Sequence, residues 1–233
     1  LDEITNSVTG CTPASFEPAI DYVVVKVPRW PFDKFKNADR TLTTAMKSTG
    51  EVMAIGRTVE EAFKKALRSL DTDTEVHTNP SEIRMILSRP TDERFATLFD
   101  AFRAGFSLEE VADLTHISPF FLEKIQHIVN HEKKLRDAPT VEDIRLAKRY
   151  GFTNAEIARD TGYPIEKVKE IAGEPTYKMV DTCAAEFPAK TPYFYSTWDT
   201  ECEIFRNDSQ KILILGSGPI RIGQGIEFDY CTV

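Results

Sequence analysis

Apolar and polar positions follow three different patterns along the 233-residue chain. Residues 21–27 and 50–56 are short apolar runs bounded by proline or glycine, and each predicts a strand. After Thr58, a suitable N-cap, residues 59–70 carry an apolar stripe at helical spacing. The pattern from 71 to 205 is almost entirely helical, with helices predicted at 81–88, 92–104, 107–115, 118–136, 140–150, 153–161 and 164–173. The pattern therefore predicts a mainly α fold flanked by incomplete α/β pieces.

The helical period is lost over residues 175–205, which contain three prolines and many aromatic residues. Disordered segments are poor in aromatics, so this composition predicts an ordered loop wrapped over the helices. Residues 211–215 form an apolar run typical of a buried parallel strand, followed by a glycine-rich turn from Gly216 to Tyr230. A βαβ unit needs about thirty residues or more. We therefore expect this chain, which also lacks an initial methionine, to be a segment of a larger enzyme.

The helical region contains an internal repeat. Residues 101–115 align with residues 147–161 at a shift of 46. Each copy has a glycine where a helix end favours a left-handed residue, Gly105 in the first and Gly151 in the second. A capping box follows each glycine, formed by Ser107 and Glu110 in the first copy and by Thr153 and Glu156 in the second. In the helix that follows each copy, the corresponding apolar positions are Leu122 with Val168 and Ile125 with Ile171. The sequence predicts a duplicated three-helix unit.

Composition and charge exclude several classes of function. The chain has 41% apolar and 28% charged residues, a formal net charge of −8 and a pI near 5.2, which argues against a broad nucleic-acid footprint. No apolar run approaches the length of a membrane span, and no leader for secretion is present. Cys11, Cys183, Cys202 and Cys231 are far apart, which predicts reduced, intracellular cysteines rather than a zinc site or a disulfide framework.

The repeat also resembles a helix-turn-helix, so DNA binding is an alternative function. A recognition helix needs base-reading and basic residues near its N-terminus. The first copy instead begins that helix with the apolar residues 118–123, and residues 101–125 carry a net charge of −2. The second copy carries about +1. Helices packed against each other are the simpler interpretation, with Phe120 and Phe121 in a core or an interface.

Two further patterns could carry chemistry. Gly216 and Gly218 fit the first two glycines of a dinucleotide fingerprint, but Arg221 stands where the third belongs. A small nucleotide-binding enzyme that uses this turn remains a third alternative. His127 and His131 have the i, i+4 spacing of zinc ligands without an obvious third ligand, so we expect a solvated helix face. The sequence contains no self-sufficient active site.

Over its whole length the chain resembles a middle segment of the carbamoyl-phosphate synthetase large-subunit family. The stretches that carry the resemblance are residues 12–22, 43–58, 180–187, 195–197 and 216–230, in the order of the family. Residues 71–150 resemble the family in pattern more than in motif.

The resemblance implies a domain layout. Residues 1–70 correspond to the C-terminal tail of the first ATP-grasp half, which makes carboxyphosphate from bicarbonate and ATP. Residues 71–204 correspond to the helical oligomerisation domain. Residues 205–233 correspond to the start of the pre-ATP-grasp domain of the second half, which phosphorylates carbamate to carbamoyl phosphate.

The resemblance also implies which functions lie elsewhere in the parent ligase. ATP, its Mg²⁺ or Mn²⁺ ions and potassium belong to the ATP-grasp cores, so no catalytic, cofactor or metal residue is assigned to this chain, which alone is predicted to be inactive. The implied partners are the glutaminase small subunit and a second copy of the chain, in a cytoplasmic enzyme of arginine and pyrimidine biosynthesis. Gly225 is a candidate for the wall of the family's tunnel, or a glycine required only by turn geometry.

Self-association through the helical region requires an exposed apolar face. We expect this face to be formed by aromatic and aliphatic residues of two predicted helices: Phe95, Leu98, Phe99, Phe102, Phe120 and Phe121.

Overall fold

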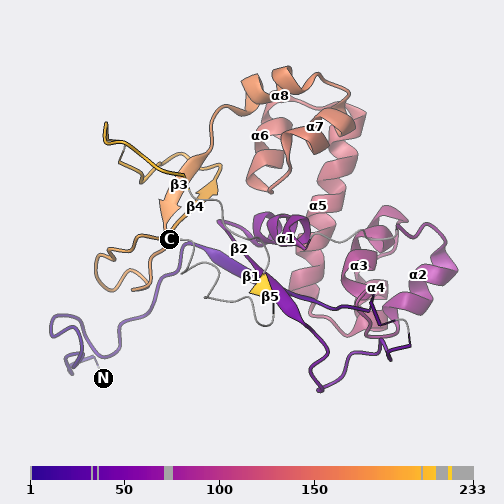
Figure 1. Ribbon diagram of the computed structural model, residues 1–233, viewed down its shortest axis with the longest axis horizontal. Helices are drawn as coiled ribbons and strands as arrows, with labels where there is room; N and C mark the ends of the chain where they lie inside the picture. The colour runs from indigo at the N-terminus through magenta and orange to yellow at the C-terminus, as the bar shows by residue number, and fades with distance from the viewer. Residues whose placement is uncertain are drawn as a thin grey trace.

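The computed structural model describes residues 2–32, 34–35, 37–70, 76–205, 207–213 and 220–221 (Figure 1). Strands β1 (Val23–Arg29) and β2 (Gly50–Gly56) pair antiparallel, with Val25 opposite Ala54. The short strand β5 (Ile220–Arg221) lies on the other edge of β2. Residues 211–213 of the predicted terminal strand are not in a strand, and 214–215 lie outside the described residues.

Helix α1 (Val59–Ser69) packs on one face of this sheet (Figure 1). Thr58 caps it as predicted, because its side chain accepts a hydrogen bond from the Glu61 backbone N–H at 3.1 Å. Alternation along the strands points one set of side chains at the helix. The small core formed there consists of Val27, Val52, Ala54 and Ala66.

The seven predicted helices of the central region are all present, each within about two residues of its expected ends. They are α2 (Pro80–Leu87), α3 (Arg94–Arg103), α4 (Leu108–Thr115), α5 (Pro119–Asp137), α6 (Val141–Arg149), α7 (Asn154–Thr161) and α8 (Ile165–Ala172). Figure 1 shows α5 running between two groups, with α2, α3 and α4 at one end and α6, α7 and α8 at the other. The fold is therefore mainly α, as predicted.

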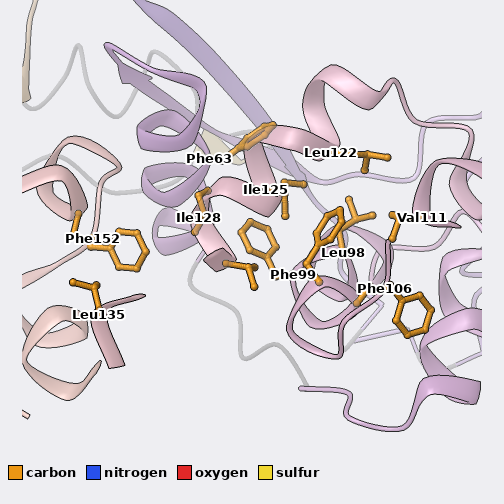
Figure 2. Close-up of a cluster of buried hydrophobic side chains, with 14 of the residues drawn as sticks. Phe63, Leu98, Phe99, Phe106, Val111, Leu122, Ile125, Ile128, Leu135 and Phe152 are labelled. Carbon is orange, nitrogen blue, oxygen red and sulfur yellow. The ribbon is translucent and has the colours of Figure 1, made fainter. Parts of the chain in front are cut away.

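A continuous hydrophobic core joins α1 to both groups of helices. Phe63 of α1 belongs to the same buried cluster as Leu98 of α3, Ile128 of α5 and Phe152 before α7 (Figure 2). Fully burying one such side chain contributes about 1.5–3 kcal/mol relative to an exposed one. Helix α1 is thus held by the helical region as well as by its own sheet.

The two copies of the repeat share the same backbone hydrogen bonds. Gly105 and Gly151 have φ of 89° and 83°, and the following Phe106 and Phe152 each donate a 3.0 Å bond to the carbonyl five residues earlier. Thr115 and Thr161 each donate a 2.7 Å side-chain bond to the carbonyl four residues earlier. The duplicated three-helix unit is confirmed in α3–α5 and α6–α8.

Residues 176–197 contain a small sheet in place of the predicted loop. Strands β3 (Thr176–Met179) and β4 (Phe194–Thr197) pair antiparallel, with Thr176 opposite Thr197. A later residue also binds this sheet, because the Glu203 N–H donates to the Tyr177 carbonyl of β3 at 2.8 Å. The prediction of a loop was wrong for these two strands. In a strand of four residues the alternation of apolar and polar side chains is too short to distinguish the strand from an aromatic-rich loop.

Candidate functional site

Gly216, Gly218 and Gly225 of the glycine-rich turn lie outside the described residues. Arg221 belongs to β5, whose backbone alone is described. Within the described part of the chain, no three histidine, cysteine, aspartate or glutamate side chains gather as metal ligands would. No described helix is both long and apolar enough to cross a membrane.

The two histidines of the i, i+4 pair do not share a solvated face. His127 Nδ1 lies 3.0 Å from Glu60 Oε1 of α1, whereas His131 is buried and its Nε2 lies 2.8 Å from the Asp143 carbonyl oxygen. Burial lowers the pKa of His131, which favours the neutral imidazole. The expectation of a solvated face was wrong for His131, because α6 packs over it.

The expected apolar face is divided between core and surface. Leu98, Phe99 and Phe102 are buried in the helical core and Phe95 is partly buried against it, so this part of the predicted face was wrong. Phe120 and Phe121 at the start of α5 are instead 51% and 47% exposed, which excludes them from the core. Their rings form an edge-to-face contact with centroids 5.2 Å apart. We call these two residues the aromatic pair.

Glu61 of α1 is the centre of a network of polar contacts, and its side chain is fully buried. Its Oε2 accepts hydrogen bonds from the Arg57 backbone at 2.8 Å and from the Thr197 hydroxyl of β4 at 2.9 Å. Lys65 forms an ion pair with its Oε1 at 2.8 Å. A buried carboxylate is tolerated only when it is paired and hydrogen-bonded. Glu61 therefore ties β2, α1 and β4 together.

The second three-helix unit contacts α1 at the Gly151 turn. A Cβ at Gly151 would lie 3.0 Å from the Glu61 carbonyl oxygen, so the two backbones are in close contact. Arg68 donates to the Gly151 carbonyl at 2.6 Å, and Lys64 pairs with Glu156 of α7 at 2.6 Å. Burial works to raise the pKa of Glu156, but Lys64 and Thr153 hold it below its usual value. This junction fixes α7 on α1.

Lys148 at the end of α6 adds the segment after β4 to the same junction. Its buried ammonium donates to the Phe152 carbonyl at 2.9 Å and to Asn154 Oδ1 at 2.8 Å, and lies 4.5 Å from the centre of the Trp198 ring. Burial, assisted by the nearby Arg68 charge, lowers the pKa of Lys148 to about 8. The cation at the end of α6 therefore contacts both the turn before α7 and the segment after β4.

Two of the sequence stretches that carry the resemblance, residues 12–22 and 180–187, meet at the connection between β3 and β4. Glu186 Oε1 accepts from Asn6 Nδ2 at 2.8 Å and from the Thr12 hydroxyl at 2.5 Å. The Ala19 N–H donates to the carbonyl of Ala184, a residue with a left-handed backbone at φ 51°. Residues 6–19 and 184–186 thus form one surface although they are distant in sequence.

Ion pairs complete the contact between the N-terminal region and the segment after β4. Arg57 pairs with Asp21 and, at 2.9 Å, with Asp199. Lys178 of β3 pairs with Glu203 at 2.6 Å. The arrangement holds strands, helices and connecting segments together; it brings no nucleophile, base and substrate cleft into one place among the described residues.

Sequence reasoning missed most of these junction residues. Nothing in the sequence singled out Glu61 and Lys148, because their partners Thr197 and Trp198 come from a segment without a periodic pattern. A second capping box, Thr140 with Asp143, precedes α6 and follows the Ser/Thr-x-x-acid spacing, so it could have been found.

Comparison with known proteins agrees with the resemblance. Residues 51–175 match the family described as carbamoyl-phosphate synthetase large chain, oligomerisation domain, and residues 208–233 match the carbamoyl phosphate synthase preATP-grasp domain. Carbamoyl phosphate synthase large chains from Methanocorpusculum labreanum and Methanoregula boonei are 73% and 74% identical over the whole chain. The chain spans 22% of the length of these curated relatives. The matches give no support to the helix-turn-helix alternative.

Proposed function

The chain belongs to the carbamoyl-phosphate synthetase large-chain family, and from this premise we propose that it is the segment that joins the two catalytic halves of such an enzyme. The parent activity would form carbamoyl phosphate from bicarbonate, two ATP and ammonia released from glutamine by a small subunit. It would operate in the cytoplasm and supply arginine and pyrimidine synthesis.

The observation that carries the proposal is the shared core of α1 and the two three-helix units. A flexible linker would leave α1 packed only on its own sheet, whereas Phe63 is buried with Leu98 and Ile128 of the helical region. The Glu61 and Lys148 junctions also hold the segment after β4 to the same helices. Such an arrangement supports a rigid connection, in which the orientation of one half constrains the other.

The domain boundaries stay as proposed from the sequence, at residues 1–70, 71–204 and 205–233. Helix α1, which the family match over residues 51–175 includes, would then connect the first half to the oligomerisation domain. ATP, Mg²⁺ or Mn²⁺ and potassium would bind in the parts of the parent that this chain does not cover. Gly225 remains our candidate for a wall residue of the tunnel between the two phosphorylation sites.

Self-association is the second element of the proposal, and the aromatic pair is its best candidate surface. Aromatic residues are enriched at protein interfaces, and contiguous exposed apolar patches mark interaction sites. Phe120 and Phe121 are the adjacent members of the expected face that remain exposed. We therefore assign the contact between copies to the start of α5.

A chimera tests the joining role. The corresponding segment of the Methanocorpusculum labreanum large chain, 73% identical, would be replaced by this chain. Glutamine-dependent carbamoyl phosphate synthesis is expected to survive, while a matched chimera with a Gly/Ser segment of equal length should be inactive. A folded chimera that carries this chain and makes no carbamoyl phosphate would contradict the proposal.

Calorimetry tests the assignment of ATP to the rest of the parent. Titration of the 233-residue chain with ATP and Mg²⁺ is expected to give no saturable heat. Tight, saturable binding would instead favour the alternative of a self-contained nucleotide-binding protein.

A further inference from the structure

A cavity of about 220 Å³ lies where α1, α3, α5 and α7 meet. Its walls combine an apolar side, which includes Leu67, Leu70 and Phe99, with a charged side. Drug-sized ligands fill pockets of about 300–1,000 Å³, so this space suits a smaller molecule. Because the four helices come from both three-helix units and from α1, a ligand here would contact all three parts.

The carboxylates of the cavity already have cationic partners. Glu156 pairs with Lys64 at 2.6 Å, and Glu132 receives two bonds of 2.9 Å from Arg103. Asp100 pairs with Arg103 at 3.0 Å and also accepts the His77 backbone N–H at 2.9 Å. These acids therefore have little capacity to attract a cation from solution.

Two cations at the junction between α1 and the second three-helix unit, Arg68 and Lys148, have only neutral acceptors among the described residues. Arg68, which lines the cavity and is exposed, donates one N–H to the Gly151 carbonyl at 2.6 Å. Lys148 donates to a carbonyl and to an amide oxygen, and no carboxylate of the described chain forms an ion pair with either cation. Burial is the main cause of the lowered pKa of Lys148, and the positive charge of Arg68 lowers this pKa further. The negative charge of Glu156 raises it.

A second arginine faces the same cavity with unused donors. Arg159 of α7 is 65% exposed, and its Nε and Nη2 groups bond Asp160 at 3.2 Å. A guanidinium has five N–H donors, and neither Nη1 of Arg159 nor most donors of Arg68 have an acceptor among the described residues. Guanidinium groups are the side chains best matched to phosphate, because they present parallel donors and a permanent charge.

We propose that this cavity binds a small phosphate monoester. Its phosphate contacts Arg68 and Arg159, and its short carbon chain lies against Leu67, Leu70 and Phe99. Binding would hold α7 to α1 across the Gly151 turn, so the ligand would stiffen the junction between the second three-helix unit and the N-terminal region. The inference does not depend on the joining role, since it concerns only the described helices.

The test uses the intact 233-residue chain and three solutes at matched ionic strength: propyl phosphate, inorganic phosphate and sodium chloride. Matching ionic strength removes general screening effects. Calorimetry and NMR titration are expected to show saturable binding of propyl phosphate, weaker binding of inorganic phosphate and none of chloride. No saturable binding of propyl phosphate would overturn the proposal, and equal affinities of the two phosphates would overturn the assignment of the apolar wall.

Two substitutions locate the site. Arg159→Gln should weaken propyl phosphate binding by about tenfold or more, since a charge-assisted bond is lost. The fold should survive this change because Asp160 keeps its 3.2 Å contact with Arg136. The matched control is Arg145→Gln on α6, an exposed arginine paired with Glu142 and absent from the cavity lining. Equal binding by both variants would place the site elsewhere and overturn the proposal.

Arg68→Gln provides an independent check. Circular dichroism first establishes that the variant is folded, since the change also removes the bond to Gly151. A folded Arg68→Gln protein is expected to lose binding by about tenfold or more. Wild-type affinity in this variant would exclude Arg68 as a phosphate ligand.

Discussion

Gly105 and Gly151 hold the same left-handed backbone at corresponding positions of the repeat, yet their surroundings differ. A Cβ at Gly105 would have no neighbour within 4 Å, whereas one at Gly151 would lie 3.0 Å from the Glu61 carbonyl oxygen and 3.1 Å from its Cα. The first glycine is thus required by the turn alone. The second is required by the turn and by close contact with α1.

Substitution of these two glycines separates the two requirements. Gly105→Ala should destabilise the protein by about 1–2 kcal/mol, the cost of a left-handed alanine. Gly151→Ala should cost at least about 1 kcal/mol more, because the new methyl group would force α1 and the turn apart. Urea denaturation followed by circular dichroism gives both values. Equal costs would show that the contact with α1 contributes nothing.

Lys148 should make stability depend on pH in alkaline solution. Its pKa is lowered to about 8 in the folded protein, whereas an unfolded lysine titrates near 10.4. Between these values the unfolded chain binds more protons, so the free energy of unfolding rises with pH. We expect a rise of about 2 kcal/mol from pH 8 to pH 10, since each pKa unit corresponds to about 1.4 kcal/mol and solvent screens part of it.

Lys148→Met should remove this rise. Denaturation curves at several pH values for wild type, Lys148→Met and the control Lys169→Met, an exposed lysine of α8, provide the measurement. The control should follow wild type. A wild-type stability that falls with pH at the same rate in all three proteins would contradict the assigned role of burial at Lys148.

Helix ends show how the elements of this fold are determined. In the second copy, Thr153 and Glu156 form a complete capping box, with bonds of 3.1 and 2.7 Å between each side chain and the other's backbone. In the first copy, Ser107 accepts from the Glu110 N–H at 3.1 Å, but Glu110 turns to Arg84 of α2. The same sequence signal therefore produces two different caps.

Thr153→Ala should consequently cost more than Ser107→Ala. An N-cap substitution typically costs about 1 kcal/mol, and the threonine hydroxyl also donates to Glu156 at 2.9 Å. We expect about 1.5 kcal/mol for Thr153→Ala and about 1 kcal/mol for Ser107→Ala, measured by thermal and urea denaturation. The reverse order would indicate that the bond from the Thr153 hydroxyl to Glu156 has no energetic value.

Helices with several turns of apolar spacing and an N-cap residue could be predicted from the sequence. Elements whose conformation depends on contacts distant in sequence could not. Helices α1 and α7 carry an N-cap residue and apolar spacing that are local in sequence. Strands β3 and β4 have four residues each and pair across an irregular loop, so their partner decides their conformation. Leu98 and Phe120 were equally apolar in the sequence; only the position of α5 relative to α3 separates a core residue from an exposed one.

At the scale of the molecule, α1 packs both against the sheet and against the helical core. Its residue Ala66 packs on the sheet and its residue Phe63 packs in the helical core. The Glu61 side chain binds β4, and the Gly151 turn packs against the backbone of the same residue. A displacement of the helical region would therefore be transmitted to β1 and β2, as the joining role requires.

The central claim is that this chain is both a joining and a self-associating module, and sedimentation velocity of the 233-residue chain over a wide concentration range tests the self-association most directly. We expect the wild-type sedimentation coefficient to rise with concentration, and the double variant Phe120→Ser, Phe121→Ser to remain monomeric and folded. Met85→Ser, which changes a comparably exposed apolar residue on α2, should behave as wild type. A wild-type chain that stays monomeric at the highest concentration would contradict the account.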